Sequence, residues 1–297
     1  MDLSQLEVLV AVAQERGFSR AAARLHRTQP AVSQSVRRLE EEVGTPLVDR
    51  SSKDGTLTAT GLVLLGFAQQ MLNLRRDART AIQELGDLRR GKLTIAANEY
   101  TVMHLLPLLG TFRSRHPQVR VEVRRTLASQ IPSEVLNREA EMGVLTYRPT
   151  NPGLAILPFE TDDLILLVAR EHALSRRTRV SIRDLGGESF LAHNVRSPNR
   201  ERVIQTFERF RTPLHIVMEL PTLEAIKLLV EKGLGVALMP RRAAELEIAR
   251  GSLVAIEVPE MRLARSILLI HRKGASLSHA AHAFLACVGE RAEPARS

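Results

Sequence analysis

The sequence predicts an α/β protein built from three consecutive parts: a helical segment over residues 1–60, one long helix over residues 61–90, and an α/β domain over residues 91–297. Three observations predict this order. Short amphipathic segments with capping residues fill the first part, one narrow apolar stripe runs through the second, and strand-like and helix-like segments alternate through the third. Because 44% of the 297 residues are apolar, the first and third parts each have enough apolar material for a core.

The first helix is predicted over residues 3–13, where apolar side chains recur at helical spacing. Asp2 precedes them and Gln5 follows three positions later, a pairing that typically caps a helix N-terminus. Gly17 ends this helix, and Ser19 is expected to cap a second, short helix.

Thr28 is expected to cap a third helix that has Pro30 in its first turn and ends near Val43. The stripe expected to face the core consists of Ala31, Val32, Val36, Leu39 and Val43. The polar residues left on the other faces are Gln29, Ser33, Gln34, Arg37 and Arg38. Because glutamine pairs with adenine edges and arginine with guanine or phosphate, we expect this helix to enter a DNA major groove.

A two-stranded wing is expected to follow the third helix. Residues 46–50 form its first strand, residues 51–55 a turn, and residues 57–58 its second strand. The wing carries Arg50 and Lys53, which are expected to contact the DNA backbone or minor groove. The residues predicted to contact DNA are therefore Thr28, Gln29, Pro30, Ser33, Gln34, Arg37, Arg38, Arg50 and Lys53.

The placement of charge supports this prediction more than the net charge of +9 does. Residues 1–60 are formally neutral, with eight basic and eight acidic side chains, yet six arginines and no carboxylate lie between Glu15 and Glu40. A surface that contacts phosphates requires such a segment, although an ordinary solvated helix face would show it as well.

An ordered set of small, apolar and polar positions stands out in residues 1–60: Ala21-Ala22, Leu25-His26, Thr28 to Ser33, Leu39-Glu40, Gly44, Leu47 and Leu57-Thr58-Ala59. This set resembles the LysR-type transcriptional regulators. It departs from their pattern at Val48, where Phe is usual, and at Gly61, because Thr60 delays the usual glycine. The resemblance implies a transcription regulator that binds a pseudo-palindromic operator in double-stranded DNA, as a dimer or tetramer, with RNA polymerase as a further partner.

The long helix carries a seam typical of a coiled coil, with apolar residues at alternating four- and three-residue steps and Arg75 interrupting them. The expected dimerisation residues are Leu64, Ala68, Met71, Ala78, Ile82 and Leu85. Packing of this helix onto its own domain is the alternative. The resemblance favours a dimer, because the linker helices of the family pair antiparallel. Arg75 would then set the register or reach an acidic partner across the interface.

Residues 91–297 alternate between strand and helix patterns, which is typical of a parallel α/β sheet. Strands are expected at 92–97, 119–123, 143–145, 165–169, 190–192, 216–218, 233–239 and 267–270. Helices are expected around 105–112, 129–138, 200–211 and 222–232.

This third part resembles the effector domain of the same family, and the best local match runs from Leu229 to Pro240. The resemblance implies a two-lobed fold like that of periplasmic solute-binding proteins, with the ligand between the lobes. Lobe I is expected over residues 91–161 plus 267–297, and lobe II over residues 162–266. Arg138 stands where the family often has glycine, with Glu141 supplying the following acid, so this turn is expected to be built differently.

Effector-binding residues are expected at strand carboxyl ends and helix N-termini, where α/β sheets bind ligands. They are Asn98, Tyr100, Thr101, Ser129, Arg196 and Thr222. Their hydroxyls and nearby free amides, with the charge of Arg196, favour a carboxylate, so the expected effector is a small organic anion. For Ser129 and Thr222, simple capping of a helix is the alternative.

Residues typical of an enzyme or a cofactor site are not grouped in this sequence. Residues 233–235 lack the third glycine of a dinucleotide loop, and His279 and His282 have no cysteine or clustered carboxylate beside them. Ser189 and Ser197 lack the flanking glycines of a hydrolase turn. We therefore expect no cofactor, no metal and no catalytic residue.

Two other functions compete with a regulator. A small-molecule-binding protein would leave residues 1–60 unexplained, and an enzyme fused to a DNA-binding domain would need a catalytic group that the sequence does not show.

No run approaches the roughly 18 apolar residues of a membrane span, and Asp2 stands where a signal peptide is basic, so a cytoplasmic protein is expected. Cys287, the single cysteine, lies in an apolar stretch and is expected to be a packed thiol.

Overall fold

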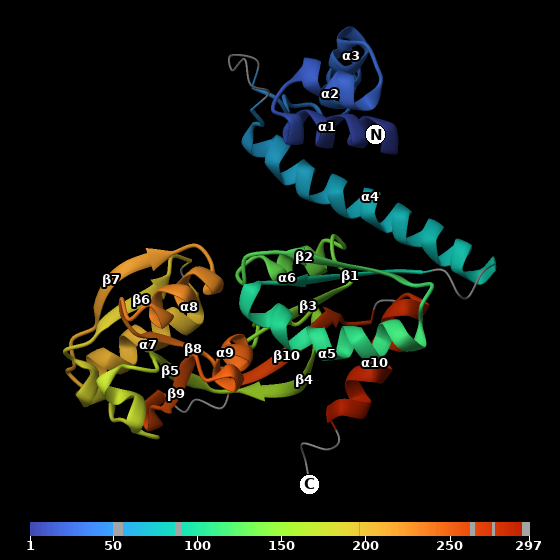
Figure 1. The fold of residues 1–297 in the computed structure, drawn as a ribbon. Coiled ribbons are helices and arrows are strands. Elements are labelled where there is room, and N and C mark those ends of the chain that lie inside the picture. Colours follow the sequence, from blue (N-terminus) through green and yellow to red (C-terminus); the bar gives the residue numbers. More distant parts are fainter. Residues whose placement is uncertain (50–55, 87–90, 196, 262–264, 275–276, 293–297) are drawn as a thin grey trace. The chain divides into compact units, whose positions relative to one another are not determined.

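The computed structural model describes residues 1–49, 56–86, 91–195, 197–261, 265–274 and 277–292. The chain forms two compact units, residues 1–88 with 137–139 and residues 89–136 with 140–297 (Figure 1). The first unit is helical and the second is α/β, as predicted.

The first unit consists of α1 (Leu3–Glu15), α2 (Phe18–Leu25), α3 (Gln29–Val43) and α4 (Ala59–Gly86). The predicted cap of α1 is confirmed, because the Asp2 carboxylate accepts a hydrogen bond from the Gln5 amide at 2.8 Å and the Gln5 side chain accepts one from the Asp2 amide at 2.7 Å. Thr28 caps α3 as predicted, since its hydroxyl accepts a hydrogen bond from the Ala31 amide at 3.4 Å.

The predicted Ser19 cap is wrong. The chain reverses at Arg16, which adopts a left-handed φ of 50°, and α2 begins almost at once. Gly17, which has no side chain, therefore occupies the N-cap, and Ser19 lies inside the first turn of α2.

The core of the first unit is formed where α1 and α2 cover one face of α3. Val32, Val36 and Leu39 are buried there, at steps of four and three residues. Ala31 and Val43 are exposed, contrary to prediction. Ala31 lies about 100° around the helix from Val32, off the buried stripe, and Val43 is the last residue of the helix.

The segment after α3 is held to the helix by Glu40, a buried carboxylate whose Oε1 accepts hydrogen bonds from the amides of Leu47 at 2.9 Å and Val48 at 3.2 Å. Val48 pairs with Leu57 in one isolated antiparallel bridge, where two short strands were predicted. A Cβ added to Gly61 would collide with the Leu47 carbonyl oxygen, so the start of α4 requires glycine at this position.

The second unit contains a five-stranded sheet in the order β2-β1-β3-β10-β4. Its strands are β1 (Lys92–Ala97), β2 (Arg120–Arg125), β3 (Met142–Leu145), β4 (Leu154–Asp162) and β10 (Arg265–Arg272). Helices α5 (Glu99–Arg115) and α10 (His279–Ala292) pack with Leu93 and Ile95 in one core, while α6 (Ile131–Leu136) packs with Ala96 in another. We call this sheet and its three helices lobe I.

The remaining strands form lobe II, in two smaller sheets. In the first, β5 (Leu164–Ala169) lies antiparallel between β8 (Ala237–Pro240) and β9 (Leu253–Glu257). In the second, β6 (Ser189–His193) runs parallel to β7 (His215–Leu220). The helices of lobe II are α7 (Pro198–Arg209), α8 (Leu223–Glu231) and α9 (Glu245–Arg250), with short 3-10 helices at 173–176, 182–185, 241–244 and 259–261.

The sheet of lobe I is mixed, where a parallel α/β sheet was predicted. In lobe I, β1 is parallel to β2 and β3, but β10 is antiparallel to β3 and β4. Strand β4 was not predicted because Pro158 interrupts its apolar pattern; it lies at the edge of the sheet, where a strand tolerates proline. Strand β9 was missed as well.

Helix α6 is shorter than the predicted helix over residues 129–138. It ends before Arg138, which adopts φ 61°, the left-handed conformation that glycine adopts most easily. Glu141 then accepts two hydrogen bonds from Ser278, at 2.7 Å from its amide and 2.8 Å from its hydroxyl. Arg138 thus adopts a left-handed conformation at a position where glycine would do so more easily.

Candidate DNA-binding and effector sites

The N-terminal half of α3 presents a polar surface. Six of the residues predicted to contact DNA are exposed, namely Thr28, Gln29, Pro30, Gln34, Arg37 and Arg38, and Ser33 is half-buried. Thr28 uses its hydroxyl to cap the helix. Arg50 and Lys53 lie outside the described residues.

The arginines of the basic segment divide into two groups. Arg24 contacts Gln14 at 2.7 Å and Glu15 at 3.0 Å, and the Arg27 guanidinium donates to the Ser4 hydroxyl at 3.1 Å. Arg37 and Arg38, by contrast, are exposed and make no ion pair within the part of the chain that the structure describes. Arg16 and Arg20 are exposed as well, and Arg20 and Arg27 bond only to neutral oxygens, so Arg37 and Arg38 are the arginines that α3 itself offers to phosphates.

Helix α4 has two apolar faces, and the residues predicted to form one dimerisation seam come from both of them. Ala68 is fully buried in the core of the first unit, so the prediction that it faces a partner is wrong, while Leu64 is half-buried and packs on the same core. Arg75 forms an ion pair with Glu7 of α1, inside its own unit. The apolar side chains that α4 leaves exposed include Leu62, Val63, Phe67, Met71, Leu74 and Ile82.

Of the other seam residues, Ala78 is exposed and the side chain of Leu85 lies outside the described residues. The exposed face therefore follows Val63, Phe67, Met71 and Leu74, then Ala78 and Ile82, at steps of three or four residues. Met71, Ala78 and Ile82 of the predicted seam lie on this exposed face, whereas Leu64 and Ala68 pack on the core that α4 shares with α1.

Asn98 and Thr101 cap α5 together. The Asn98 side-chain oxygen accepts hydrogen bonds from the amides of Tyr100 at 3.0 Å and Thr101 at 2.9 Å, while the Thr101 hydroxyl accepts one from the Asn98 amide at 3.0 Å. Thr101 is fully buried. The side-chain oxygens of both residues are therefore engaged within the cap.

Two of the other predicted effector residues, Tyr100 and Thr222, lie near one another, because their chain neighbours Glu99 and Leu223 share a hydrogen bond of 2.8 Å. Ser129 is exposed in the turn before α6, and Thr222 caps α8 by accepting a hydrogen bond from the Ala225 amide at 3.2 Å. Arg196 lies outside the described residues. Tyr100 packs against the apolar core of lobe II, and its ring lies 5.7 Å from that of His193.

Glu99, which sequence reasoning passed over, joins the two lobes. Its Oε1 accepts a hydrogen bond from the Leu223 amide at 2.8 Å, and its Oε2 lies 3.1 Å from His193 Nε2. The Val195 amide donates to His193 Nδ1 at 3.1 Å, so in the neutral ring the proton resides on Nε2 and points to Glu99. In the sequence, an acidic residue in the first turn of a helix indicates only a favourable interaction with the helix dipole. The Leu223 amide that Glu99 binds is 124 positions away, so no local pattern indicates this contact.

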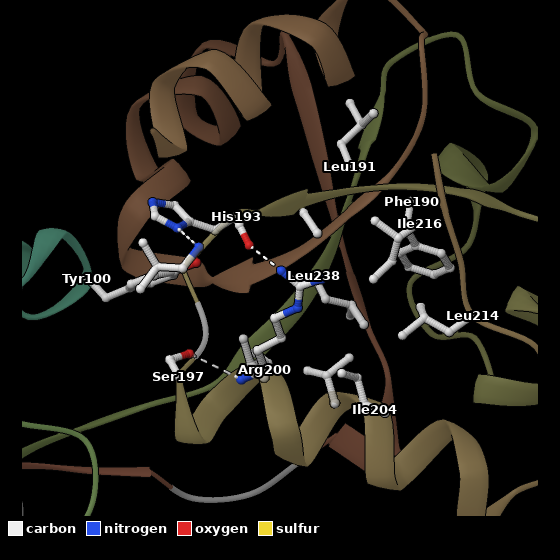
Figure 2. Close-up of a pocket in the computed structure, with 14 residues that line it drawn as sticks. Tyr100, Phe190, Leu191, His193, Ser197, Arg200, Ile204, Leu214, Ile216 and Leu238 are labelled. Atoms are coloured by element: carbon white, nitrogen blue, oxygen red, sulfur yellow. Dashed lines mark hydrogen bonds between the residues drawn. The ribbon is translucent and has the colours of Figure 1, made fainter. Parts of the chain in front are cut away.

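A small cavity of about 70 Å³ lies in lobe II beside Tyr100 and His193 (Figure 2). Its walls are mainly apolar side chains of Leu164, Phe190, Leu191, Val195, Val203, Ile204, Leu214, Ile216 and Leu238. At the polar end, Arg200 donates to the His193 carbonyl oxygen at 2.8 Å and forms an ion pair with Glu219. The cavity thus combines an apolar interior with a polar end next to Glu99.

His104 of α5 is buried between two carboxylates of β4. Its Nδ1 lies 2.7 Å from Glu160 and its Nε2 lies 3.1 Å from Asp162. Burial alone lowers the pKa of His104, but the hydrogen bonds to Asp162 and Glu160 together with their negative charges outweigh burial and leave the pKa above its ordinary value. Arg242, from the 3-10 helix at 241–244 in lobe II, approaches Glu160 at 4.0 Å.

The residues considered for other chemistry are dispersed. His279 and His282 are exposed on α10, and Cys287 is buried. Gly233, with φ 73°, turns the chain after α8. In the described part of the chain, no cluster of histidine, cysteine or carboxylate side chains could hold a metal ion, and no helix has the length and apolarity to cross a membrane.

A helix-turn-helix with an exposed polar face, joined by a long helix to a two-lobed α/β domain, defines a class of DNA-binding regulators with a ligand-binding domain. The chain belongs to the LysR family of transcriptional regulators. The family pattern described as "Bacterial regulatory helix-turn-helix protein, lysR family" matches residues 3–62, and that of the "LysR substrate binding domain" matches residues 86–293.

Relatives and solved structures agree with this assignment. A "Probable RuBisCO transcriptional regulator" of Trichormus variabilis is 31% identical over 95% of this chain and 86% of that protein. The "HTH-type transcriptional activator CmpR" of Synechocystis sp. is 29% identical over 95% of this chain and 93% of that protein. The fold is similar to that of full-length CbnR, solved in complex with its target DNA, with a TM-score of 0.74, 23% identity and coverage of 98% of this chain and 100% of that one.

Proposed function

We propose that this regulator reads its operator with the exposed face of α3. Gln29, Pro30, Ser33 and Gln34 would approach base edges, and Arg37 and Arg38 would bind phosphates. The observation that carries this proposal is the contrast within the basic segment: Arg24 and Arg27 are engaged by their own unit, whereas Arg37 and Arg38 are not. Arg50 and Lys53 of the wing would add contacts to the backbone or minor groove.

The regulator would act as a homodimer through α4, or as a tetramer of such dimers. The support is the exposed apolar stripe, in which Val63 is 64% and Ile82 69% exposed. An apolar stripe of this length on a single helix is unfavourable in water and is typical of a coiled-coil surface. Two paired helix-turn-helix units match a pseudo-palindromic operator.

The effector would be a small organic anion with a short apolar group, bound between the lobes. Lobe II offers donors where it meets α5: the first amide of α8, at Leu223, and His193 Nε2. The adjoining cavity would take the apolar group, because its walls away from the polar end are aliphatic and aromatic. Binding would favour one arrangement of the lobes and so change the geometry of the paired DNA-binding units.

Calorimetry with a panel of metabolite acids, combined with gel shifts on the intergenic DNA beside the gene, tests this proposal. We expect one acid to bind and to alter the affinity or length of the DNA site. Turnover of the acid would support an enzyme instead. Binding of an acid without any specific DNA complex would support a solute-binding protein.

A further inference from the structure

The carboxylate of Glu99 already occupies the position in which lobe II would hold an anion. Leu223 supplies the first amide of α8, one of the amides that have no partner inside a helix and carry its positive end. That amide donates to Glu99 Oε1 at 2.8 Å, while Thr222 caps a different amide, that of Ala225. The helix N-terminus is thus satisfied in part by its own residue and in part by a carboxylate from the other lobe.

His193 makes this position specific for an acceptor. Its side chain is only 7% exposed, and the hydrogen bond from the Val195 amide fixes Nδ1 as an acceptor. The Nε2 proton is then directed at Glu99 Oε2, at 3.1 Å. Both oxygens of the carboxylate are therefore bound by lobe II, whereas the residue that carries them is the first of α5 in lobe I.

We infer that Glu99 is an interlobe latch, a tethered substitute for an effector carboxylate, and that a free carboxylate binds lobe II by exchange with it. The inference rests on the proposed effector site and identifies what competes for it. The displaced side chain would keep a partner in lobe I, because Arg125, at the end of β2, already lies 3.9 Å from Glu99 Oε2 and is largely exposed. The latch holds the lobes together while the effector is absent and opens when the effector arrives.

Rescue of a truncated latch by propionate, a small free carboxylate that can replace the missing carboxylate of Glu99, tests this inference. In Glu99→Ala, we expect the Leu223 amide to exchange with deuterium about tenfold faster than in the unchanged protein, the loss expected for a charge-assisted hydrogen bond. Sodium propionate should restore its protection, and propionamide or sodium chloride at equal concentration should not. Hydrogen exchange of peptides across residues 221–226 gives the readout in the full-length protein.

Two further variants keep the result interpretable. Glu99→Gln retains an oxygen for the Leu223 amide but presents an amide nitrogen to His193, so it should protect Leu223 partly and respond weakly to propionate. Glu224→Gln removes a mostly exposed carboxylate from the same first turn of α8 and should exchange like the unchanged protein. Circular dichroism confirms that each variant is folded.

The latch is refuted if Leu223 exchanges equally fast with and without Glu99, or if propionate and propionamide protect the alanine variant alike. The proposed function is tested separately, by effector and operator binding of the unchanged protein. A regulator that binds an acid and its operator, but whose Glu99→Ala variant shows no propionate rescue, would retain the proposed function and lose the latch.

Discussion

The carboxylate of Glu40 on α3 accepts a hydrogen bond from the backbone amide of Leu47 at 2.9 Å, and so fixes the segment that leads from the recognition helix into the wing. The same oxygen accepts from Val48 at 3.2 Å, in a buried environment. We expect Glu40→Ala to lower the free energy of unfolding of this unit by about 1 to 3 kcal/mol, because buried amides lose their acceptor. Urea titrations of the full-length protein measure the change.

Glu40→Gln keeps an acceptor oxygen and should be less destabilising than Glu40→Ala. Glu41→Gln, at an exposed neighbouring position, serves as the control. Equal stability of the alanine variant and the unchanged protein would mean that this hydrogen bond does not hold the wing segment in place.

Substitutions of the residues proposed to contact bases and of those proposed to contact phosphates should change DNA binding in different ways. Gln29→Ala and Ser33→Ala should each reduce discrimination between operator and random DNA by about 1 to 3 kcal/mol. Arg37→Ala should weaken both kinds of DNA alike and reduce the slope of log affinity against log salt by about 1. Gel-shift titrations at several salt concentrations measure both quantities.

Arg24→Ala is the matched control, because Arg24 is engaged by Glu15 in the same basic segment. It should leave the salt slope nearly unchanged. Full specificity in the Gln29 and Ser33 variants would show that another surface reads the operator.

Local signals made much of the first unit predictable. Asp2 and Thr28 could be identified as caps because their partners lie three residues away. The buried face of α4 could not be identified, since apolar residues occur on two sides of the helix. Contact with α1 decides that Leu64 and Ala68 face inward, and this contact is absent from the local pattern.

The effector site shows the same limit more clearly. Asn98 and Thr101 are polar residues at a strand end, yet their side-chain oxygens are used to cap α5. Glu99 between them reaches the other lobe, and its partners His193 and Leu223 are far away in sequence. Strand and helix positions were predictable, but the pairing of side chains across lobes depends on tertiary packing.

The two faces of α4 predict opposite outcomes for the same kind of substitution. Ile82→Glu places a carboxylate on the open stripe and should separate the proposed dimer while leaving each subunit folded, because an unpaired buried charge costs several kcal/mol at an interface. Leu64→Glu should instead destabilise the first unit itself. Sedimentation equilibrium and thermal unfolding distinguish the two effects. An unchanged oligomer in Ile82→Glu would place the interface elsewhere.

His104 makes stability depend on pH in a defined direction. The pKa of His104 is raised in the folded protein because its hydrogen bonds to Asp162 and Glu160 outweigh the opposing effect of burial. A group whose folded pKa is higher than its unfolded pKa binds protons more tightly when folded. Its contribution to stability is therefore complete below the unfolded value, about 6.5, and is lost as the pH rises through the raised folded pKa.

We therefore expect the free energy of unfolding of the second unit to fall as the pH rises above about 6.5, and His104→Gln to remove this part of the dependence. Both ring nitrogens contact carboxylate oxygens, at 2.7 and 3.1 Å, so only the doubly protonated ring can donate to both while they are ionised. Thermal unfolding of the full-length protein between pH 6 and 9 measures the effect, with His282→Gln on the exposed face of α10 as the control. Parallel curves for His104→Gln and the unchanged protein would show that deprotonation of this histidine does not weaken the connection between α5 and β4.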